Sequence, residues 1–142
     1  MTSKHWLFPS LFLMAGLAAC GGGSTGDPPQ TATCSIPPTP LMIYPMPGAT
    51  AVPAGGFTLV FNFAAPGTLS IVQSAKSVTG SLQATAAPSP LPSPHASVPP
   101  SSLPLAGYSV PALGAHTQYE VLDTLASVGP CPSVSIGSFT TK

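Results

Sequence analysis

The sequence has very few charged side chains. Its 142 residues include only three Lys and three acidic residues, no Arg, and a formal net charge of zero. Proteins that bind nucleic acid neutralise its phosphates with Lys and Arg, so this composition excludes a nucleic-acid partner. Glu, Lys and Arg also favour helices. Their scarcity, together with 20 Pro and 14 Gly, argues against a helix-rich soluble enzyme.

Residues that carry catalysis are equally scarce. Glu120 and Asp123 fall on opposite faces of one predicted strand and Asp27 lies far before it, whereas a glycosidase needs two carboxylates in one cleft. His95 and His116 have no metal-ligand spacing to cysteine or carboxylate, and no G-x-S-x-G motif occurs. We therefore expect a non-enzyme with no catalytic residues, metal or cofactor.

The N-terminal segment predicts export. An apolar stretch over residues 6–19 follows a weakly basic start and is interrupted by Pro9. This pattern is typical of a secretory signal peptide. The stretch is also shorter than the ~20 residues that a membrane-spanning helix needs. We predict a signal peptide over residues 1–19.

The end of this stretch, Leu17-Ala18-Ala19-Cys20, resembles the lipobox of bacterial lipoproteins. The resemblance implies cleavage before Cys20 and acylation of its sulfur, and more than one acyl chain gives stable membrane attachment. Gly21 stands where an aspartate would retain such a protein in the inner membrane, which favours the outer membrane of a Gram-negative cell envelope. The alternative is an ordinary signal peptide with a cysteine near its cleavage site.

Composition divides the mature chain into a tether and a domain. Residues 20–33 hold Cys20 and a Gly/Ser/Pro-rich stretch without hydrophobic periodicity, which is typical of a flexible tether. From Cys34 the chain shows short apolar runs punctuated by Pro and Gly, without a sustained helical period. We predict one all-β domain over residues 34–142.

Alternation of apolar and polar residues predicts the strands. In the clearest one, Phe57, Leu59, Phe61 and Phe63 form one apolar face. Gly137 interrupts the last one, as a β-bulge would. The predicted strands cover residues 57–63, 67–73, 77–85, 117–127 and 132–142.

A Pro-rich loop separates the third predicted strand from Tyr108. Prolines recur over residues 86–106 too often for a central strand, since each removes a hydrogen-bond donor. We expect an extended spacer or a loop that covers a sheet edge. Its PLPSP segment also suits proline-recognition modules, although a cell-envelope location separates it from their usual partners.

Two segments resemble immunoglobulin-like domains. "YPMPGATAVPAGGFTLVFNF", residues 44–63, is similar to the opening of bacterial Ig-like domains, and "LGAHTQYEV", residues 113–121, to the fibronectin type III segment before the sixth strand. The resemblance implies a β-sandwich of about seven strands. It also implies a tyrosine corner, in which the Tyr119 hydroxyl turns back to the preceding backbone and Leu113 packs beneath the ring.

The mature domain retains two cysteines, Cys34 at its start and Cys131 before the last strand. Export permits oxidation. In a seven-stranded antiparallel sandwich the first and last strands begin at the same end, so we predict a Cys34–Cys131 disulfide. Free buried thiols and intermolecular pairing are the alternatives.

Together these features predict a cell-envelope lipoprotein whose Ig-like domain is a non-catalytic binding or structural module. Its partners would be the membrane, through the lipid anchor, and an envelope protein. One alternative is a surface carbohydrate-binding module, if Tyr44, Tyr108 and Phe139 form an exposed aromatic patch rather than core packing. A secreted hydrolase is a further alternative and predicts a cleft with converging polar groups.

Overall fold

The computed structural model describes residues 34, 36–102, 104–125 and 133–142. In this part of the chain nine strands form two sheets, and the only helical turn is the 3-10 helix η1 (Pro100–Ser102). The four-stranded sheet has the order β1 (Met42–Tyr44), β3 (Phe57–Phe61), β7 (Ala106–Val110), β6 (Gln83–Thr85). The five-stranded sheet has the order β2 (Ala49–Val52), β9 (Val134–Thr141), β8 (Gln118–Thr124), β4 (Thr68–Gln73), β5 (Lys76–Ser77).

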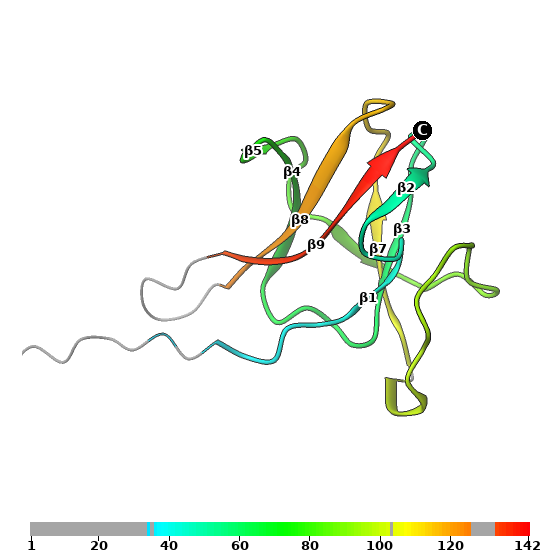
Figure 1. Cartoon of the computed structure of the whole chain (residues 1–142). Coiled ribbons are helices and arrows are strands. Elements are labelled where there is room, and N and C mark those ends of the chain that lie inside the picture. The colour runs from blue at the N-terminus through cyan, green and yellow to red at the C-terminus, as the bar shows by residue number, and fades with distance from the viewer. Residues whose placement is uncertain (1–33, 35, 103, 126–132) are drawn as a thin grey trace, which may run out of the picture. The chain divides into compact units, whose positions relative to one another are not determined.

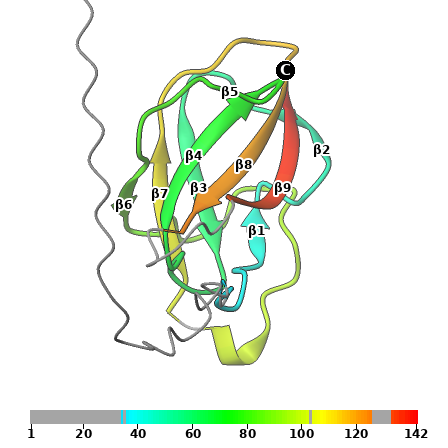
Figure 2. The same ribbon diagram turned by 90° about the vertical axis from the view of Figure 1, so that its left-hand side faces the viewer.

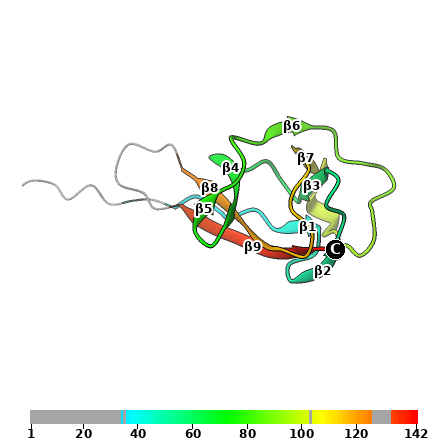
Figure 3. The ribbon, with the colours of Figure 1, turned by 90° about the horizontal axis from the view of Figure 1, so that it is seen from above.

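The two sheets pack face to face, so the predicted all-β class is confirmed. Seen from above, β6 and β7 lie on one side of the domain and β5, β8 and β9 on the other (Figure 3). The start of the domain contributes to both sheets. Strand β1 pairs antiparallel with β3, and β2, a few residues later, pairs parallel with β9.

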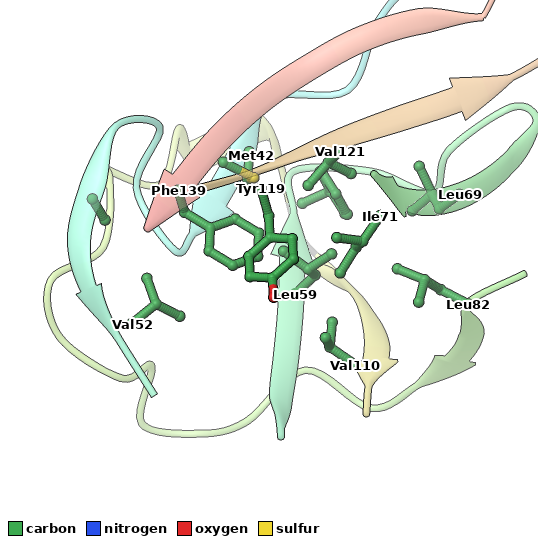
Figure 4. Close-up of a cluster of buried hydrophobic side chains, with 12 residues drawn as sticks. Met42, Val52, Leu59, Leu69, Ile71, Leu82, Val110, Tyr119, Val121 and Phe139 are labelled. Atoms are coloured by element: carbon green, nitrogen blue, oxygen red, sulfur yellow. The ribbon is translucent and has the colours of Figure 1, made fainter. Parts of the chain in front are cut away.

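The core fills the space between the sheets. Leu59 of β3 lies close to Ile71 of β4 and Val121 of β8 in this core (Figure 4). Phe61 belongs to the same cluster, and all four side chains are buried. The Phe139 ring meets Phe57 edge-on, with centroids 5.4 Å apart. In β8 the residues alternate between buried and partly exposed, as the sequence predicts for a strand with one face on the core.

Strand β3 differs from its predicted form. Phe63 lies beyond the strand end and is 37% exposed, so it is not part of the predicted apolar face. Val60, on the opposite face, is fully buried. The reason is a second apolar cluster outside the four-stranded sheet, which alternation within a single strand does not reveal.

The Pro-rich loop builds that second cluster. Ile43, Tyr44 and Val60 are buried there, with side chains from the loop packed over them, namely Ala87, Leu91, Val98 and Leu105. The Ala96 N–H also donates to the Ile43 carbonyl, at 2.8 Å, so the loop lies along the outer edge of β1. In Figure 1 this yellow-green segment extends beside β1 and β7, away from β4 and β8. Of the two predicted roles, covering an edge is the one observed.

The predicted third strand over residues 77–85 is wrong. The chain forms β5 in one sheet, leaves it, and forms β6 in the other sheet. The Val-Thr-Gly-Ser-Leu stretch over residues 78–82 carries the crossover, and Thr79 stays bound to the five-stranded sheet because its Oγ1 accepts the Ile71 N–H at 2.9 Å. The predicted count of about seven strands is also too low. The third predicted strand is in fact two strands, β5 and β6. The start of the domain also forms two strands, β1 and β2, in different sheets, which was not expected.

The predicted bulge at Gly137 is confirmed. Val121 pairs with Gly137 but Leu122 pairs with Ser135, which leaves Ile136 as an extra residue in β9. A Cβ at position 137 would lie 2.9 Å from the Met42 Cε atom. Gly137 therefore also leaves room for the Met42 side chain against the last strand.

The sandwich has two distinct ends. At the N-terminal end the chain enters β1, and β3 connects to β4. At the C-terminal end lie the β4–β5 turn, the connection over residues 111–117 and Lys142. In Figure 2 the C-terminus and β5 are at the top, and the chain entering β1 is at the bottom.

Candidate functional site

An open hollow of about 620 Å³ lies at the C-terminal end of the five-stranded sheet. The end of β4, the β4–β5 turn, the start of β8 and the middle of β9 surround it. Side chains that point outward from these strands give it a polar lining, because the inward-pointing residues fill the core. The residues that line it are Val72, Gln73, Ser74, Ala75, His116, Thr117, Gln118, Tyr119, Glu120 and Ser138.

The rim of the hollow has an unusual backbone. Ser74, Ala75 and His116 have φ angles of 48°, 63° and 52°, and in the described chain these are the non-glycine residues with positive φ. Ser74 and Ala75 form the two-residue loop between Gln73 and Lys76, which pair across the hairpin. Such a loop requires positive φ at both positions and usually uses Asn-Gly. Here the two positions are occupied by Ser and Ala, whose small side chains lie at the edge of the hollow.

The side chains in the hollow suit hydrogen bonding to a polar ligand. Gln73 and Gln118 offer amides, Ser138 a hydroxyl and Glu120 a carboxylate. Glu120 pairs with Val72 on one side and Ser138 on the other, so it sits centrally on the outer face of the sheet. The predicted separation of Glu120 from Asp123 is confirmed, since Asp123 is buried in the core.

Hydrogen bonds hold the connection over residues 114–117, whose His116 and Thr117 line the hollow. The Tyr119 hydroxyl accepts the Gly114 N–H at 2.9 Å and lies 3.4 Å from the Gly114 carbonyl. Leu113 packs against the core. The Tyr119 hydroxyl thus turns back to the preceding backbone, as the resemblance implies, whereas the packing of Leu113 beneath the ring stays a prediction. The Thr141 hydroxyl adds a bond to the Gly114 carbonyl, at 2.6 Å, and accepts the Thr117 N–H, at 3.1 Å.

Asp123 is the most unusual buried group and lies at the other end of the sandwich. It is 2% exposed, and its Oδ1 has no hydrogen-bond partner in the described chain. Burial raises the pKa of this carboxyl, and the backbone hydrogen bond from Gly67 lowers it by less. A side chain at position 67 would collide with Asp123 Oδ1 and the Thr124 carbonyl, so Gly67 permits this packing.

The three aromatic residues considered for a surface patch do not form one. Tyr44 and Phe139 are buried, and burial raises the pKa of Tyr44. Tyr108 is partly buried in the packing around the core, and its hydroxyl accepts the Ala65 N–H at 3.0 Å. All three rings contribute to core packing, which was the alternative to an exposed aromatic patch.

The remaining candidate residues are scattered. His95 is exposed in the Pro-rich loop, with Nδ1 3.0 Å from the Ala96 carbonyl, whereas His116 lies on the rim of the hollow. Over residues 34–125 and 133–142, as far as the structure describes them, no three His, Cys, Asp or Glu residues could hold a metal ion. Asp27, Cys20 and Cys131 lie outside the described residues, so the lipid anchor and the Cys34–Cys131 disulfide stay predictions.

Sequence reasoning did not find the hollow. Gln73, Gln118 and Ser138 come from three separate strands, and only the pairing of β4, β8 and β9 brings them together. The alternation in β8 does predict that Gln118 and Glu120 lie on the outer face. It does not predict which residues of β4 and β9 pair with them, because that depends on strand register.

Comparisons of the chain with protein-family models, curated proteins and solved structures found no match. The described residues contain no helix that is both long and apolar enough to span a bilayer.

Proposed function

We propose that this chain is a cell-envelope lipoprotein, attached through Cys20, whose domain is a non-catalytic binding module. The lipobox-like Leu17-Ala18-Ala19-Cys20 supports the attachment. The observation that carries the binding role is the polar hollow over β4, β8 and β9. It offers hydrogen-bonding groups around Glu120 without the second carboxylate that glycoside hydrolysis requires.

The domain is best interpreted as an immunoglobulin-like sandwich. In that fold one sheet has the strand order A-B-E-D and the other contains C, F and G. The order β1-β3-β7-β6 corresponds to the first sheet and β4-β8-β9 to the second, with β2 as the part of the first strand that crosses over. Tyr119 at the start of β8 occupies the place of the tyrosine corner at the start of strand F.

The partner that suits the hollow is an envelope protein presenting a polar segment. The hollow is open and its lining is largely polar, so hydrogen bonds rather than a deep apolar pocket would give specificity. A carbohydrate ligand is supported less, because the rings of Tyr44 and Phe139, which could have stacked on a sugar, are buried.

Metabolic labelling tests the attachment. Cells expressing the full chain are grown with an alkyne-bearing fatty acid, and labelling and detergent-phase partitioning are compared between wild type, Cys20→Ser and Cys34→Ser. We expect label and detergent partitioning in wild type and Cys34→Ser, and neither in Cys20→Ser. Equal labelling of all three forms, or of none, would exclude Cys20 as the anchor.

Site-directed photocrosslinking in the native host tests the binding role. A photoreactive amino acid at position 118, in the hollow, is compared with one at position 83 on the exposed strand β6. The captured envelope protein is then purified, and its affinity for wild type and for the Gln118→Ala/Glu120→Ala variant is measured. Loss of one or two hydrogen bonds predicts roughly two- to hundredfold weaker binding. Unchanged affinity would mean that the partner does not bind in the hollow.

A further inference from the structure

Two apolar segments lie next to each other at the N-terminal end of the sandwich. One is Ile-Pro-Pro-Thr-Pro-Leu over residues 36–41, and the other is Phe-Ala-Ala-Pro over residues 63–66. Two hydrogen bonds join Leu41 to Asn62, the residue before Phe63: the Leu41 N–H donates to Asn62 Oδ1 at 2.7 Å, and the Asn62 N–H donates to the Leu41 carbonyl at 3.1 Å. Three large side chains in these segments remain exposed: Ile36 by 55%, Leu41 by 46% and Phe63 by 37%.

The exposed charged residues lie at the opposite end of the sandwich from these apolar side chains. Of the charged residues that the structure describes, Asp123 is buried, while Lys76, Glu120 and Lys142 lie toward the C-terminal end. Neither apolar segment contains a charge. The N-terminal end thus exposes hydrocarbon in a setting with no charge to keep it hydrated, whereas isolated exposed apolar residues are common on any surface.

The position of the proposed anchor indicates what covers this end. Only residues 21–33 separate Cys20 from Cys34, and their composition predicts a flexible coil. A chain of this length spans about 20 Å between its ends on average. With Cys20 as the anchor, the tether therefore keeps the N-terminal end of the domain within reach of the bilayer.

We propose that the N-terminal end rests on the membrane surface, with Phe63, Leu41 and Ile36 in the lipid headgroup region. This inference rests on the proposed attachment through Cys20. Because the end is uncharged, the contact is with the apolar boundary of the bilayer and does not require anionic lipid. The polar hollow, at the opposite end, then faces away from the membrane.

Tryptophan fluorescence tests the contact. Trp6, in the predicted signal peptide, is the chain's only tryptophan, so a substituted one is the single emitter in the processed protein. The Phe63→Trp variant and the matched Val78→Trp variant are expressed as full chains, purified after processing by the cell and added to phosphatidylcholine vesicles with brominated acyl chains. Val78 has similar exposure, 43%, but lies beside β4, where its N–H donates to the Ile71 carbonyl.

We expect brominated lipid to quench tryptophan at position 63 by roughly half, since interfacial side chains lie about 5–10 Å into the headgroup boundary. At position 78 we expect the same emission in brominated and ordinary lipid. Equal quenching at both positions, or none at 63 while the protein co-sediments with the vesicles, would overturn the contact but leave the anchor intact. Failure to co-sediment, with mass spectrometry showing no acyl group on Cys20, would overturn the proposed attachment and the contact with it.

Discussion

The two ends of the sandwich are built from different interactions. At the C-terminal end, Tyr119 and Thr141 fasten the connection over residues 114–117 to the strands through several hydrogen bonds. At the N-terminal end, the Tyr108 hydroxyl accepts the Ala65 N–H, and Leu41 and Asn62 exchange two hydrogen bonds. Within the described residues, however, one oxygen of the buried Asp123 has no partner. Hydrogen bonds thus serve both ends, but only the N-terminal end also carries an unpartnered buried carboxyl group and the predicted disulfide.

The largest expected effect comes from that disulfide. Removing a cross-link that closes a loop of about 100 residues should lower the free energy of unfolding by up to about 4–5 kcal/mol. We expect this loss in urea unfolding of Cys34→Ser and of reduced wild type, but not of Cys20→Ser. Hydrogen exchange should accelerate first in β1 and the start of β9. If neither reduction nor Cys34→Ser changes stability, the N-terminal end is held without a disulfide.

A matched pair of Tyr→Phe substitutions compares the hydroxyls at the two ends directly. Tyr119→Phe removes two bonds, one from the Gly114 N–H and one to the Gly114 carbonyl, and should cost about 1–3 kcal/mol. Tyr108→Phe removes only the bond from Ala65 and should cost about 1 kcal/mol. Thermal and urea unfolding measure both values. A larger loss for Tyr108→Phe would reverse the ranking of the two ends.

The smallest effect is expected from Asp123→Asn, and it depends on pH. Burial raises the pKa of Asp123 in the folded state, so the folded state binds its proton more tightly than the unfolded state. Stability is then lost as pH rises from about 4, the ordinary aspartate pKa, through the raised folded value. Asp123→Asn removes the buried charge and should stabilise the domain at neutral pH by on the order of 1 kcal/mol.

Unfolding midpoints measured from pH 3 to pH 8 check this assignment. The difference between wild type and Asp123→Asn should vanish at acidic pH. Glu120→Asn, on the outer face of the same strand, serves as the control and should not show the same pH-dependent gain. A constant difference at every pH would mean that ionisation of Asp123 is not the cause.

Local patterns predicted much of this fold. The alternation in β8, the bulge at Gly137 and the approximate limits of β3, β4 and β9 follow from residue order alone. The predictions that were wrong concern residues whose surroundings depend on segments far away in the sequence. Val60 is buried because a loop about 30 residues later covers it, and residues 77–85 divide between two sheets.

The candidate site shows the same limit. Tyr119 and Leu113 were identified from one contiguous segment, so a local resemblance was enough. Gln73 and Ser138 join Glu120 only through strand register, and Asp123 is unusual only because of its burial. Residues that act through contacts between strands leave little trace in a single sequence.

The Pro-rich loop has a consequence for association between molecules. An open strand edge recruits strands from neighbouring chains, and crowding on a membrane would favour this. Because Ala96 occupies the Ile43 carbonyl and the loop covers Val60, the β1 edge and the outer face of its sheet are already occupied. The loop therefore shields the β1 edge against pairing with strands of neighbouring chains.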